Sequence, residues 1–118
     1  MEETLQSARP FEQFVLLSVV ELSVKGETPA HSYDVAETAR NRLDDVDREP
    51  FGGVERQEVI SALRTLADED VLAKDRTESA TGKGRPAYEL AVDADTVLDE
   101  LEDAETVGPY AEALRADA

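Results

Sequence analysis

The fold of this chain is decided by residues 54–92, which begin with VERQEVISALRTLAD (54–68) and end with TGKGRPAYELAV (81–92). Apolar residues recur at helical spacing through the first of these segments, which predicts an amphipathic helix. The apolar segment at 71–73 and the alternating segment at 87–92 predict two paired strands. Glycines and cationic residues occupy the turn between the strands. We therefore expect a helix followed by a β-hairpin with a basic tip.

The charge of the chain is strongly negative. Its 118 residues include 28 Asp and Glu against 12 Lys and Arg, which gives a formal net charge of −16. Periodic Leu, Val and Ile residues argue against a disordered acidic protein. Adaptation to concentrated salt explains the excess, because a carboxylate-rich surface stays hydrated while salt screens its self-repulsion. The alternative is an ordinary acidic protein.

The residue types present exclude or disfavour several kinds of site. The absence of cysteine excludes disulfides, thiolate metal sites and cysteine-based redox sensing. His31 is the only histidine, and adjacent acids such as Asp99 and Glu100 point to different sides of a helix. We therefore expect no enzyme, metal site or cofactor. No apolar run is long enough to span a membrane and the N-terminus has no basic leader, so we expect a cytoplasmic protein.

Three regions are expected along the chain. They are a polar N-terminal extension at 1–9, a folded domain at 10–92, and a C-terminal helix with a tail at 93–118. The first helix of the domain is expected to start near Pro10, since proline suits a first turn, and to end before Gly26. Its apolar residues cover most of its circumference, which predicts that it is buried on most sides.

Two further helices are expected before the hairpin. Thr28-Pro29 or Ser32 is expected to cap the second helix, because hydroxyl side chains accept hydrogen bonds from unpaired amides. A loop containing Pro and Gly follows, and the third helix is expected to begin near Val54. After the hairpin, Asp93 is expected to cap a last helix and Gly108-Pro109 to break it, with one or two further turns beyond.

This order of elements predicts a winged helix-turn-helix domain, mainly α with a small β-hairpin and with a C-terminal dimerisation helix. In such a domain the third helix enters the major groove of DNA. Gln57 on its outward face can pair with adenine, Arg64 with guanine, and Ser61 with a base or a phosphate. Arg56 in the first turn is placed for a phosphate contact. The alternative is a helix face that only water contacts.

The predicted hairpin tip holds Lys83, Gly84 and Arg85. Nine of the 12 cationic residues lie between Arg40 and Arg85, so the cations gather in the region expected to meet DNA. Glycine permits a tight turn, and the two cations can follow a phosphate backbone or enter a narrow minor groove. The alternative is a solvated turn.

A second copy of the chain is expected to complete the core, because aromatic residues make up only 5% of the sequence. The last predicted helix carries an apolar stripe that a small domain would not leave exposed. We expect it to form a homodimer interface with the start of the first helix. The residues expected at this interface are Leu5, Phe11, Val97, Leu98 and Leu101.

Three motifs resemble those of PadR-like winged-helix transcriptional regulators of halophilic archaea. PAHSYDVA (29–36) is similar to the start of that family's second helix, and VISALRTLADEDVL (59–72) to its recognition helix. GRPAYEL (84–90) is similar to the returning strand of its wing and is the most specific of the three. The chain departs from the family at Ser32, where glycine is usual, and at Val59-Ile60, where Leu-Tyr is usual.

This resemblance implies a homodimer that binds double-stranded DNA at a pseudo-palindromic operator and controls a response to reactive oxygen species. In a high-salt cytoplasm, inorganic cations are expected at the DNA interface, since carboxylates and phosphates would otherwise repel one another. The alternative is a winged-helix module that binds another protein and has no specific DNA binding.

Overall fold

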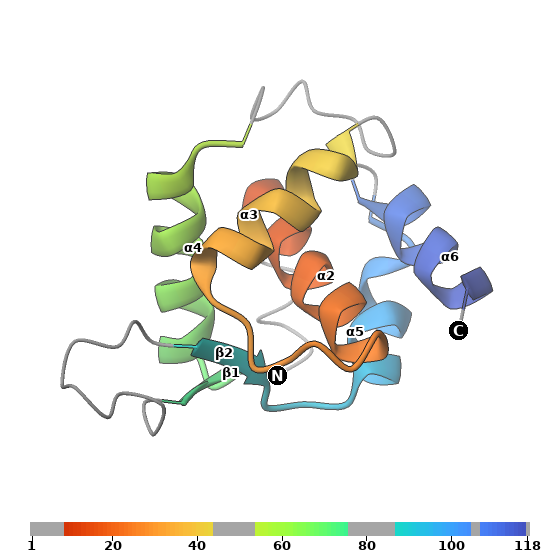
Figure 1. Cartoon of the computed structure of the whole chain (residues 1–118). Coiled ribbons are helices and arrows are strands. Elements are labelled where there is room, and N and C mark those ends of the chain that lie inside the picture. The colour runs from red at the N-terminus through yellow and green to blue at the C-terminus, as the bar shows by residue number, and fades with distance from the viewer. Residues whose placement is uncertain (1–8, 44–53, 76–86, 105–106, 118) are drawn as a thin grey trace, which may run out of the picture.

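The computed structural model describes residues 9–43, 54–75, 87–104 and 107–117, which form five helices and one small antiparallel sheet. The helices are α2 (Pro10–Val24), α3 (Ser32–Asn41), α4 (Arg56–Asp68), α5 (Ala94–Leu101) and α6 (Gly108–Asp117). The strands are β1 (Leu72–Asp75) and β2 (Ala87–Leu90). Figure 1 shows α2 in the centre, with α3 and α4 on one side of it and α5 and α6 on the other.

Helix α2 is the centre of the hydrophobic core. Ten consecutive residues, Gln13–Leu22, are buried, so the prediction of a helix covered on most sides is confirmed. Pro10 is its first residue, and the Glu12 carboxylate accepts a hydrogen bond of 3.3 Å from the backbone N–H of Arg9. Gly26 follows the helix with a φ of +75°, a conformation that favours glycine after a helix end. Every other helix is positioned by packing on α2.

Helix α3 begins at Ser32, and the residue before it, His31, is its N-terminal cap. The Asp34 carboxylate accepts a hydrogen bond of 3.3 Å from the backbone N–H of His31, so the cap position is His31 rather than Thr28-Pro29 or Ser32. Val35, Ala36 and Ala39 form the buried stripe of α3.

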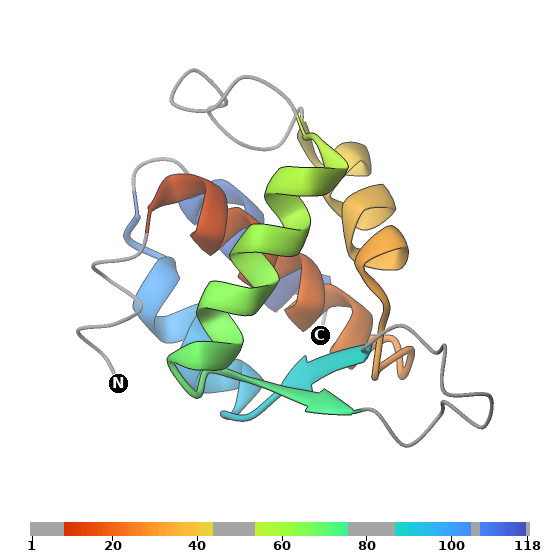
Figure 2. The same cartoon turned by 90° about the vertical axis from the view of Figure 1, so that its left-hand side faces the viewer.

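Helix α4 packs across α2 with one face and leaves the other open. Its buried residues are Val59, Ala62, Leu63 and Leu66, all on the predicted inward side. The helix starts at Arg56, two positions after the expected start at Val54. In Figure 2 α4 crosses in front of α2, and the β-hairpin follows the C-terminal end of α4.

The hairpin strands pair antiparallel, with Leu72 opposite Leu90 and Lys74 opposite Tyr88. Ala30, just before α3, adds a bridge to β2, since Ala30 and Tyr88 exchange backbone hydrogen bonds of 2.9 and 2.7 Å. This bridge ties the loop before α3 to the hairpin that follows α4. The predicted tip residues Lys83, Gly84 and Arg85 lie outside the described residues.

The apolar stripe on α5, which was predicted to form the dimer, is covered within the chain itself. Val97 and Leu101 have no exposed surface and Leu98 is 2% exposed, because α2 and α6 of the same chain cover the apolar face of α5. The stripe was expected to need a second copy because the packing of the further C-terminal turns, now α6, on α5 was not foreseen. Phe11 is half-buried at the start of α2, and Leu5 lies outside the described residues.

The turn from α5 to α6 is tightly packed. A Cβ placed on Gly108 would lie 2.7 Å from the backbone oxygen of Glu102, so a larger residue could not take this position without a backbone shift. The prediction that Gly108-Pro109 breaks the preceding helix is wrong, since α5 ends at Leu101 and Gly108-Pro109 begins α6. Among the described residues, no helix has both the length and the apolar character needed to cross a membrane.

Candidate nucleic-acid interface

The outward face of α4 brings three predicted base-reading residues together. Gln57, Ser61 and Arg64 are all exposed and lie on the side of the helix opposite its buried residues. Within the part of the chain that the structure describes, their side chains make no hydrogen bond or ion pair. A helix anchored along one face and open along the other can enter a DNA groove without losing its packing.

Arg56 and Arg64 differ from those cations of the structure that are held in ion pairs. Lys25 and Arg42 are both held by Glu21, and Arg115 is held by Asp99 and Glu102 on α5 and at its end. Arg56 and Arg64, in contrast, are exposed and form no ion pair with a described residue. In a chain with 28 acids, two unpaired arginines on one helix are available for phosphates or base edges.

The same helix also carries acids. Glu55, Glu58 and Asp68 are exposed on α4 or at its cap. Bringing this helix to DNA therefore places carboxylates near phosphates. The repulsion must be screened by salt or neutralised by cations at the contact.

The hairpin lies on the α4 side of the molecule (Figure 2), as a wing would. Its strands are short and regular, and β1 follows α4 after a turn in which Asp70 has a φ of 65°. Whether Lys83, Gly84 and Arg85 reach a DNA backbone stays a prediction, because they fall outside the described part.

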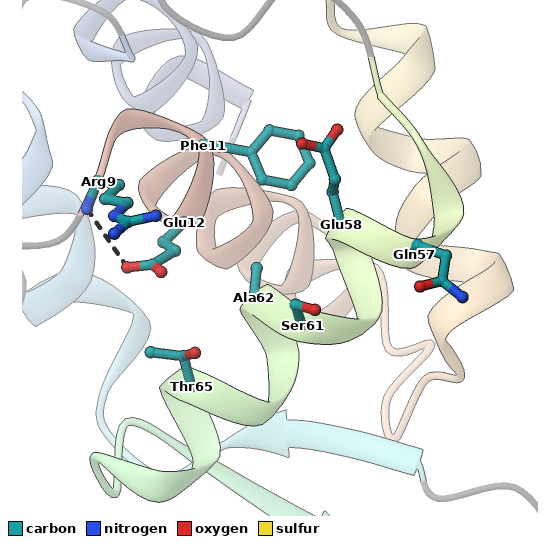
Figure 3. A pocket seen from close by; sticks show the side chains of 8 residues that line it. All are labelled: Arg9, Phe11, Glu12, Gln57, Glu58, Ser61, Ala62 and Thr65. Atoms are coloured by element: carbon teal, nitrogen blue, oxygen red, sulfur yellow. Dashed lines mark hydrogen bonds between the residues drawn. The ribbon is translucent and has the colours of Figure 1, made fainter.

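A hollow of about 410 Å³ lies between the start of α2 and the exposed face of α4. From the start of α2 come Arg9, Phe11 and Glu12. From α4 come Gln57, Glu58, Ser61, Ala62 and Thr65. Figure 3 shows the two sets of side chains on opposite sides of the hollow. Gln57 and Ser61, which were predicted to read bases, thus line the same hollow as Phe11, which was assigned to the dimer interface. No local sequence pattern could have indicated that these residues lie around one hollow.

A buried charged cluster fixes α3 and α6 on α2, and it was not predicted. The Glu21 carboxylate, 8% exposed, accepts hydrogen bonds from Arg42 at 2.9 Å, Lys25 at 2.8 Å and the Tyr110 hydroxyl at 2.8 Å. The Arg42 guanidinium also lies 5.2 Å from the centre of the Tyr110 ring. The sequence signal was Glu21, an acid close to the end of the apolar run of α2.

The electrostatics of this cluster favour an ionised Glu21. Burial alone would raise the pKa of Glu21, but hydrogen bonds from Arg42, Lys25 and Tyr110 together lower it below its ordinary value. Burial and the neighbouring carboxylate of Glu21 raise the pKa of Tyr110. The cluster is thus an ionised acid with a neutral phenol, which suits a structural tie between helices rather than proton transfer.

Comparison of the chain with protein-family models, with curated proteins and with solved structures finds no match. The described residues contain no group of three or more acidic, histidine or cysteine side chains placed to hold a metal ion. His31 serves as the cap residue of α3. The exposed face of α4 and its surroundings are the candidate functional surface among the described residues.

Proposed function

We propose that this chain is a winged-helix transcription regulator that binds specific double-stranded DNA as a homodimer. Helix α4 enters the major groove, and the β1–β2 hairpin meets the backbone or the minor groove. The arrangement of three helices followed by an antiparallel hairpin supports this proposal, since it is the element order of winged helix-turn-helix domains. The Ala30–Tyr88 bridge adds support because it joins the hairpin to the loop before α3.

One observation carries the proposal. Gln57, Ser61 and Arg64 stand exposed and without partners among the described residues, directly opposite the side of α4 that packs on α2. Amide, hydroxyl and guanidinium groups are the side chains that read base edges, and they lie here along one exposed stripe. Arg56 at the start of the same helix suits a phosphate contact, aided by the positive end of the helix dipole.

The homodimer part of the proposal needs an interface other than the α5 stripe. The start of α2, where Phe11 is half-buried, is proposed instead, together with Leu5, which lies outside the described residues. Two-fold symmetry would give a pseudo-palindromic operator with half-sites about one or two helical turns apart. The control of a reactive-oxygen response in a high-salt cytoplasm follows from the family resemblance and belongs to the same proposal.

The second candidate function is a winged-helix module that binds another protein. The acids Glu55, Glu58 and Asp68 on α4 favour it, because they oppose the approach to DNA. A gel shift in molar potassium chloride against genomic fragments separates the two functions. Enrichment of particular fragments, lost in the double variant Gln57→Ala/Arg64→Ala, supports the regulator. No enriched fragment at any salt concentration leaves the protein-binding module as the better account.

A further inference from the structure

The hollow between α2 and α4 has the chemistry of a small-molecule site. Its volume of about 410 Å³ lies within the range of roughly 300–1,000 Å³ found for such sites. Glu12 and Glu58 contribute two carboxylates to the lining and Arg9 one guanidinium, so the lining has an excess of negative charge. Glu58 and Phe11, both labelled in Figure 3, line the same hollow.

These groups select among ligands. An organic ammonium group is attracted to carboxylates by their negative charge and to an aromatic ring by the negative face of the ring. Side-chain oxygens of Ser61 and Thr65 can accept its N–H groups. A phosphate would be repelled by Glu12 and Glu58. A bare metal ion is disfavoured because no described group of three metal-binding side chains is present and Phe11 offers no ligand atom.

We propose that this hollow binds a small organic amine, and that the bound amine excludes DNA from α4. Gln57 and Ser61 line the hollow and are also the side chains assigned to base reading, so an occupant and a base pair compete for the same groups. This coupling rests on the function proposed above. The amine would be an effector that releases the regulator from its operator.

The binding step is tested without DNA, by ¹⁵N NMR titration of the full chain with phenethylamine and with 1,4-diaminobutane. Both amines are expected to give saturable shifts at the amides of Glu58, Ser61 and Thr65, with no such shifts from succinate or 1,4-butanediol. The two amines distinguish a ligand with an apolar body from a doubly charged one. If neither amine gives saturable shifts, or if the neutral diol gives equal shifts, the proposed site is overturned.

A pair of matched variants separates the site from general charge effects. Glu12→Gln/Glu58→Gln removes both carboxylates of the hollow and is expected to weaken amine binding about tenfold or more, since a charged hydrogen bond is lost. Glu37→Gln/Glu112→Gln makes the same charge change at exposed positions on α3 and α6 and should leave binding within about twofold. Equal weakening by both pairs overturns the proposal.

The coupling is tested by adding the amine to protein–DNA complexes of the wild type and of Glu12→Gln/Glu58→Gln. Amines also bind DNA directly, so the variant complex measures that background. Greater displacement from the wild type supports the coupling, and equal displacement overturns it. If no DNA binds at all, the proposed function fails, while the NMR titration still decides the amine site.

Discussion

The hydroxyl of Tyr110 in α6 donates a hydrogen bond of 2.8 Å to the carboxylate of Glu21 in α2. The same carboxylate accepts from Arg42, just after α3, so one buried acid ties the C-terminal helix to the first two helices of the domain. The Tyr110 ring also packs edge-on against Phe14 at 5.7 Å between ring centres. These contacts hold the end of α3 and helix α6 against α2, beside the apolar packing of the same helices.

Removing the Tyr110 hydroxyl should destabilise the fold. Tyr110→Phe leaves the buried Glu21 carboxylate with one donor fewer, and we expect a loss of about 1–3 kcal/mol in the free energy of unfolding. Denaturant unfolding at fixed salt measures it. Tyr33→Phe is the matched control, because Tyr33 is 53% exposed and should change stability little. Equal effects of the two variants would mean that the Glu21 contact contributes nothing.

The Glu21 cluster also predicts a pH dependence. Its folded pKa lies below the ordinary value of 4.5, so the folded state favours the ionised form and gains stability at pH above the unfolded pKa. That gain is lost as pH falls through the lower folded pKa. The stability difference between wild type and Glu21→Gln should therefore stay constant from neutral pH to about 4.5 and shrink below it. A difference that grows on acidification would contradict this sign.

Leu101 is expected to stabilise the single chain rather than a contact between copies. It has no exposed surface, so Leu101→Ala should cost about 2–5 kcal/mol in unfolding free energy, whereas Val24→Ala, at a residue 48% exposed, should cost far less. Unfolding curves and light scattering on the same samples check both properties. If Leu101→Ala produces monomers without loss of stability, α5 forms an interface between copies after all.

The sequence predicted the parts of the fold that depend on local periodicity. The apolar repeat in α4 correctly indicated its buried side, and the uninterrupted apolar run in α2 correctly indicated a central helix. The cover of the α5 stripe by α6 was not predicted, because it depends on tertiary packing at Gly108 and on the ion pairs of Arg115 with Asp99 and Glu102. Residues distant in sequence meet at Glu21 and in the hollow, and no spacing rule could bring them together.

The salt dependence of DNA binding should be unusual. An ordinary binder loses about 0.9 log units of affinity per phosphate contact for each log unit of salt. Glu55 and Glu58 bring carboxylates to the interface, so cation uptake should offset counterion release and give a shallow or inverted slope between about 0.3 and 2 M potassium chloride. Glu55→Gln/Glu58→Gln should restore a steep slope, and Glu37→Gln/Glu112→Gln should not. A wild-type slope steeper than roughly −3 would contradict the expectation of bound cations.

The central claim is that the exposed face of α4 reads DNA sequence, and one comparison of affinities tests it most directly. The affinities of wild type, Arg64→Ala and Arg115→Ala are measured for a DNA site selected from genomic fragments and for a scrambled site of the same composition. Arg115 is the control, since it lies on α6 on the opposite side of α2 from α4 (Figure 1) and is paired with Asp99 and Glu102.

A good base contact contributes about 1–3 kcal/mol, so Arg64→Ala should weaken the selected site by about tenfold or more and the scrambled site much less. Arg115→Ala should leave both affinities close to the wild-type values. Equal losses on the two DNAs for Arg64→Ala, or an equal loss from Arg115→Ala, would contradict sequence reading by α4.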